Sequence, residues 1–95
     1  MTQQYIAGEL SLLLWELQAA TTNEASVVEA AHLRRRAETG PRSALASVAV
    51  RALEVADWVC WDSLTRGDAA AFLRQGTVCT ELWEFAVCAG LLKER

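Results

Sequence analysis

Hydrophobic residues recur along this chain every three or four positions, which is the spacing of one face of an α-helix. The clearest example lies near the start of the sequence, in the stripe Ile6, Leu10, Leu13, Leu14 and Leu17. We predict a helix from Gln4 to Ala20 on this basis. The alternation that marks β-strands joined by turns does not occur in the sequence, so the pattern favours an all-α fold.

A second helix is expected after the polar segment TTNEAS, residues 21–26. Thr21 with Glu24, and Ser26 with Glu29, each match the capping box that begins many helices. We predict that this helix ends near Thr39. Its apolar face is the weakest in the chain and consists mostly of Val27, Ala30, Ala31 and Leu33.

Gly40-Pro41 is a strong helix stop, because glycine suits the left-handed position after a helix and proline cannot continue the hydrogen-bond ladder. Beyond it we predict a third helix, from Ser43 to Thr65, and a fourth, from Ala69 to Lys93, with Gly76 and Gly90 inside it. The connection Arg66-Gly67-Asp68 is short, with Gly67 ending one helix and Asp68 capping the next.

The short connection predicts that the third and fourth helices, each roughly 35 Å long at 1.5 Å per residue, form a long antiparallel hairpin. The first two helices would form a shorter hairpin beside it. The predicted fold is therefore all-α, an antiparallel four-helix bundle in a single domain, residues 1–95.

On a helical wheel, the third helix has a core stripe and a second apolar stripe. The core stripe is Leu45, Val48, Ala49, Ala52, Ala56, Val59, Cys60 and Ser63, flanked by Leu53 and Val55. Trp58 and Trp61, in the sequence DWVCWD, fall on the opposite side with Val50 and Glu54.

Two other helices repeat this pattern in a weaker form. Trp15 and Leu12 lie opposite the stripe of the first helix. In the fourth helix one face contains Phe72, Cys79, Trp83, Ala86 and Gly90, and the other side contains Val78, Phe85 and Leu92.

The second stripe has three interpretations. Tryptophan is enriched at protein interfaces, where charged residues form a rim, and Asp57 and Asp62 could supply one. A central helix, apolar nearly all round, would instead bury the tryptophans within the chain, although Arg51 and Glu54 interleave them. A ligand pocket is the third interpretation. We favour the interface, and self-association above all.

The length and composition of the chain also favour association with a partner subunit. A chain of 95 residues with 53% hydrophobic residues buries a small core when alone, and such domains are often stabilised by a partner subunit. The net charge of −3 argues against a nucleic-acid-binding surface, which needs concentrated basic residues. The sequence has no apolar run long enough to cross a membrane.

The cysteines and the N-terminal sequence indicate a cytoplasmic protein. The count of three, Cys60, Cys79 and Cys88, is odd, and MTQQYIAGEL does not resemble a signal peptide. The preference for arginine over lysine, with abundant alanine, suggests a GC-rich bacterial genome.

Chemistry-bearing motifs are sparse, so we expect no enzyme, no cofactor and no metal site. The sequence lacks C-x-x-C, H-x-x-x-H and E-x-x-H spacings and a glycine-rich phosphate loop. His32, the one histidine, precedes Arg34-Arg35-Arg36, which we interpret as a solvated helix face with an ion pair from Arg34 to Glu38. Cys60 and Cys79 are expected in the core, and Cys88 nearer the outer face.

The sequence thus predicts a non-enzymatic protein–protein interaction or regulatory module that forms a homodimer, with another protein as a further partner class. Its predicted interface residues are Trp58, Trp61, Val50, Glu54, Trp15 and Phe85. The alternative is a regulator that binds an apolar small molecule inside the bundle. Its pocket would be lined by Trp83, Cys79 and Gly76.

Overall fold

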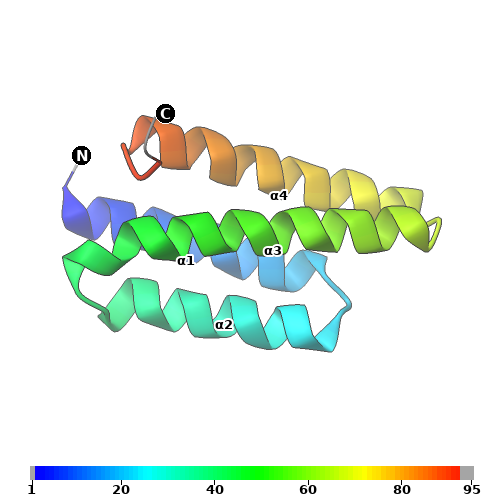
Figure 1. The fold of residues 1–95 in the computed structure, drawn as a ribbon, viewed down its shortest axis with the longest axis horizontal. Helices are drawn as coiled ribbons and strands as arrows, with labels where there is room; N and C mark the ends of the chain where they lie inside the picture. The colour runs from blue at the N-terminus through cyan, green and yellow to red at the C-terminus, as the bar shows by residue number, and fades with distance from the viewer. Residues whose placement is uncertain (1, 93–95) are drawn as a thin grey trace.

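The computed structural model describes residues 2–92, and these residues form four α-helices (Figure 1). The helices are α1 (Gln3–Ala20), α2 (Glu24–Thr39), α3 (Leu45–Thr65) and α4 (Ala69–Cys88), and a short 3₁₀ helix, η1 (Arg42–Ala44), precedes α3. The all-α prediction is confirmed, and α1 and α3 lie within two residues of their predicted bounds, whereas α2 begins inside the polar segment that was expected to precede it.

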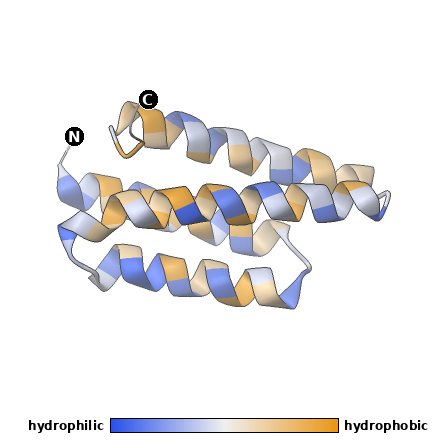
Figure 2. Ribbon diagram, viewed as in Figure 1, coloured by the Kyte–Doolittle hydropathy of each residue, from blue (hydrophilic) through white to orange (hydrophobic). Residues whose placement is uncertain are grey.

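Successive helices run in opposite directions and pack side by side as a four-helix bundle (Figure 1). α1 packs against α2 and α4, and α3 packs against the same two helices, so α1 and α3 lie diagonally across the bundle. Hydrophobic residues recur along all four helices between hydrophilic ones, as Figure 2 shows. The predicted long hairpin is present as α3 and α4.

The core is aliphatic and lies between the four helices. α1 contributes its predicted stripe, and α3 buries Leu45, Val48, Ala49, Ala52, Val55, Ala56, Val59 and Ser63. The stripe predicted for α3 is therefore confirmed except at Cys60, which is half-buried. The buried face of α2 is shifted from the prediction, and consists of Ser26, Ala30, Leu33 and Ala37.

Polar side chains and glycines set the ends of the helices. The side chain of Asn23 accepts a hydrogen bond from the Ser26 N–H at 3.0 Å and caps α2, so the two predicted capping boxes are wrong. Asp68 caps α4 as predicted, by accepting from the Ala71 N–H at 3.1 Å, and Gly67 ends the preceding turn at a φ of 74°.

Gly40 ends α2 for a reason other than the one predicted. Its φ of −79° is not left-handed, but a Cβ here would collide with the carbonyl oxygen of Arg36, to which the Gly40 N–H donates at 2.8 Å. Glycine is thus required by a close approach of two backbone segments.

α4 differs most from its prediction. It ends at Cys88, and Gly90 follows at a φ of 70° rather than lying inside the helix. A glycine in this left-handed conformation is a common C-terminal stop. The predicted end at Lys93 lies outside the described residues. The buried face was also misassigned, since it consists of Ala71, Gln75, Val78, Leu82 and Ala86.

Gln75 is a buried polar residue that joins three helices. Its side chain is 2% exposed. The Ser63 hydroxyl donates to its Oε1 at 2.5 Å, and its Nε2 donates to the carbonyl oxygen of Ala20 at 2.9 Å. The amide therefore fixes the register of α4 against α3 and satisfies a carbonyl at the end of α1.

Candidate interaction surface

Trp58 and Trp61 both lie on the solvent side of α3. Their side chains are 51% and 60% exposed, in a chain whose core is filled by aliphatic residues from all four helices. Burial of both tryptophans inside the bundle, one of the three interpretations of the sequence, is therefore wrong. The spacing of three residues places them on adjacent positions of the same helix face.

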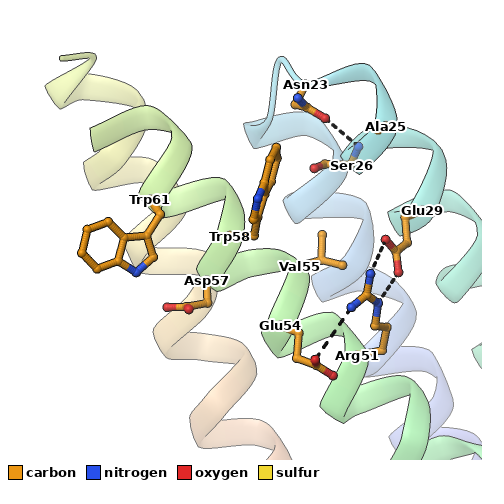
Figure 3. A pocket seen from close by; sticks show the side chains of 10 residues that line it. All are labelled: Asn23, Ala25, Ser26, Glu29, Arg51, Glu54, Val55, Asp57, Trp58 and Trp61. Atoms are coloured by element: carbon orange, nitrogen blue, oxygen red, sulfur yellow. Dashed lines mark hydrogen bonds and ion pairs between the residues drawn. The ribbon is translucent and has the colours of Figure 1, made fainter. Parts of the chain in front are cut away.

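The two rings point in different directions (Figure 3). Trp58 stands between α3 and the start of α2, near Asn23 and Ser26, and half of its surface is covered there. Trp61 projects away from α2. Trp58 is thus partly an internal contact, whereas Trp61 is the more available of the two for a partner.

A hollow of about 580 Å³ lies beside Trp58 between α2 and α3. It is lined by Asn23, Ala25, Ser26, Glu29, Arg51, Glu54, Val55, Asp57, Trp58 and Trp61 (Figure 3). The walls combine two indole rings with three carboxylates and one guanidinium. An apolar centre with a charged rim is the usual composition of a protein interface.

Arg51 connects the two helices across this hollow. Its guanidinium donates two hydrogen bonds to the Glu29 carboxylate, one of them from Nη2 to Oε1 at 2.8 Å. A second carboxylate, that of Glu54 on the same helix, lies 3.7 Å from Nη1. The guanidinium holds the pKa of Glu29 below its ordinary value, because its hydrogen bonds favour the ionised carboxylate more than partial burial disfavours it.

Three other predicted interface residues occupy different surroundings. Val50 is exposed on the outward face of α3. Trp15 is also exposed, but the Arg34 guanidinium of α2 stacks over its ring, 4.4 Å from the centroid, so one face is already occupied. Phe85 is half-buried against the core, on the side of α4 that meets α1.

The predicted ligand pocket is not enclosed by its three residues. Trp83 is 56% exposed. Cys79 packs against the core, and Gly76 lines a surface hollow with other residues of α4. The three residues share one side of α4, about a quarter-turn from its buried face at 100° per residue. That stripe faces solvent and α3 rather than a cavity between helices.

Most charged side chains lie at the surface, whereas two of the three cysteines are half-buried. Arg34 forms the predicted ion pair with Glu38, at 3.5 Å, and His32 is exposed. Partial burial raises the pKa of the Cys60 and Cys79 thiols, and Cys88 is exposed. Among the described residues, no three His, Cys, Asp or Glu side chains converge as a metal site would require.

Sequence and fold comparisons give no family for this chain. No protein-family model matches it, and searches of curated proteins and of solved structures find no significant match. Within residues 2–92, no helix has both the length and the apolar character of a membrane span.

Proposed function

We propose that this protein is a non-enzymatic interaction module that self-associates through the outward face of α3. The observation that supports the proposal is the exposure of Trp58 and Trp61 on a bundle whose core is complete without them. Burying the exposed half of an indole removes roughly 100 Å² from water, worth about 2–3 kcal/mol at 25 cal/mol per Å². Two neighbouring rings therefore offer a sizeable driving force for a contact.

The charged residues around the rings support the same function. Asp57 and Glu54 interleave the tryptophans on α3, and Arg51 lies beside them. Charged residues at the rim keep a free protomer from aggregating, while they contribute little to the free energy of association. The cysteine and arginine usage of the sequence favours a bacterial cytoplasm as the setting.

Light scattering coupled to size exclusion tests the proposal. We expect a dimeric mass for the wild type and a monomeric mass for Trp58→Ser/Trp61→Ser, with unchanged helical circular dichroism. Trp15→Ser is the matched control, because its ring is similarly exposed but lies on α1. A wild type that stays monomeric up to about 100 μM, where micromolar dimers form, would refute self-association. If the Trp58→Ser/Trp61→Ser variant remains a dimer, the interface does not lie on the α3 face.

A further inference from the structure

α4 carries an uncharged stripe on its solvent side, next to the face that it buries and turned away from the core. Its members are Ala69, Leu73, Gly76, Thr80, Trp83 and Val87, at alternating spacings of four and three. This is the heptad spacing with which one helix packs along another. Leu73 and Trp83 are 68% and 56% exposed, so the largest members of the stripe lack a covering element within the described chain.

Gly76 makes a hollow in the middle of this stripe. Open space surrounds the position that a Cβ would occupy there. The hollow measures about 430 Å³ and is lined by Phe72, Leu73, Gly76, Thr77, Thr80 and Glu81. A glycine inside a helix is unfavourable relative to alanine, and here the described chain makes no use of the space. A large side chain from outside would fit it.

Trp83 of a second copy has the size and the position to fill this hollow. If two α4 helices pack antiparallel about a two-fold axis at Thr80, position 83 of each lies opposite positions 76 and 77 of the other. The same register places Leu73 opposite Val87. In a two-fold contact the pairing occurs twice, as each copy gives one ring and one hollow. In knobs-into-holes packing, a side chain of one helix inserts into a hole formed by four residues of the facing helix. The four residues here are Leu73, Gly76, Thr77 and Thr80.

The charges on α4 favour this direction of packing. Arg74 lies in the first half of the helix, and Glu81 and Glu84 lie in the second half. In an antiparallel pair the half of each helix with Arg74 runs along the half of the other with Glu81 and Glu84, whereas a parallel pair would align halves of like charge. The helix dipoles also oppose one another in the antiparallel arrangement.

The stripe adjoins the outward face of α3. The Ser63–Gln75 hydrogen bond fixes the register of the two helices, so the exposed Trp61 and Leu64 lie at the same end of the hairpin as Gly76. A ring inserted at Gly76 would therefore have aromatic and aliphatic surface of α3 nearby.

We infer that a second copy of this chain docks antiparallel on α4, with Trp83 of each copy inserted into the Gly76 hollow of the other. This inference rests on the proposed self-association and locates its centre. It makes Trp83 an interface residue rather than part of a ligand pocket.

Two variants test the contact from both sides, by sedimentation equilibrium of the full chain. Trp83→Ala removes the knob, and Gly76→Leu fills the hollow while adding a better helix former to open space. Each is expected to raise the dimer dissociation constant at least about tenfold, as truncating a central interface tryptophan does. Trp15→Ala, the control, should change it less than about twofold. Circular dichroism verifies the fold of each variant.

Cysteine cross-linking tests the axis directly. In a Cys88→Ser background, Thr80→Cys should form an intermolecular disulfide under mild oxidation, because the axis brings the two copies of position 80 together. Leu12→Cys in the same background should not. A dimer that Trp58→Ser/Trp61→Ser weakens but Gly76→Leu and Trp83→Ala leave intact would overturn the α4 contact and preserve the proposed function. A strictly monomeric wild type would overturn both.

Discussion

Replacement of Gln75 by leucine tests how much the buried hydrogen bonds between helices stabilise the bundle. The change introduces an apolar side chain one atom shorter, and it removes the acceptor used by the Ser63 hydroxyl and the donor used by the Ala20 carbonyl. Ser63 is itself buried. The Ser63 hydroxyl would stay buried, and the Ala20 carbonyl half-buried, without their hydrogen-bond partner.

The two effects of this substitution oppose one another. Each buried polar group left without a hydrogen bond costs about 1–3 kcal/mol. The apolar leucine recovers roughly 1.5–3 kcal/mol by burial. With two groups affected, we expect a net loss of about 2 kcal/mol in the free energy of unfolding. In a domain of this size, that loss lowers the melting temperature by roughly 8–16 °C.

Urea unfolding followed by circular dichroism measures the effect, at one fixed protein concentration so that self-association contributes equally. Ser63→Ala combined with Gln75→Leu is the informative double variant, because it also removes the orphaned hydroxyl. The double variant should lose about 1 kcal/mol less free energy of unfolding than the sum of the losses of the two single variants. A Gln75→Leu variant as stable as the wild type, or strictly additive losses, would refute the reasoning.

Two further predictions follow from the ionisable groups. Because Arg51 lowers the pKa of Glu29 in the folded chain, the pair stabilises the fold above the unfolded pKa of about 4.5 and stops doing so as the pH falls through the folded value. When urea unfolding is measured at decreasing pH, the stability of Glu29→Gln should therefore decline less than that of the wild type. Equal declines in stability for the two proteins would contradict this. Burial raises the pKa of Cys60 and Cys79 while Cys88 is exposed, so a disulfide reagent should label one thiol fast and two slowly. Cys88→Ser should abolish the fast phase, and a second fast thiol would show that the half-buried pair is more open than the structure indicates.

The sequence predicted α3 well because its signals agree with one another. One apolar stripe carries the core residues, and the charged residues interleave the tryptophans on the opposite side. Strong breaks also flank the helix, at Gly40-Pro41 and at Gly67-Asp68. When periodicity and turn residues point to the same structure, a sequence specifies it closely.

α4 was assigned wrongly because two of its faces are about equally hydrophobic. Tryptophan is the largest apolar residue, so the pattern favoured Trp83 for the interior, and Gln75 made the true buried face look polar. The partners of Gln75 lie 12 and 55 residues away in sequence. The local spacing of hydrophobic residues cannot predict hydrogen bonds between residues so far apart in sequence.

The start of α2 was missed although the sequence contained its signal. Asparagine is among the best N-cap residues, and Asn23 lies inside the Thr21–Glu24 capping box that was preferred to it. The surroundings of Trp58 are a different case. Its contact with the beginning of α2 depends on how the two helices pack, and Figure 3 shows a neighbour that a helical wheel cannot supply.

The order of the helices also has a consequence for how fast the chain folds. Each helix packs against the one that precedes it, and turns such as residues 21–23 and 66–68 connect them. Most native contacts therefore join segments close in sequence, which keeps the entropy of loop closure small. Helical proteins with such local contacts fold in about microseconds to milliseconds. The Gln75 amide, which reaches back to Ala20, makes that hydrogen bond only when the two hairpins meet.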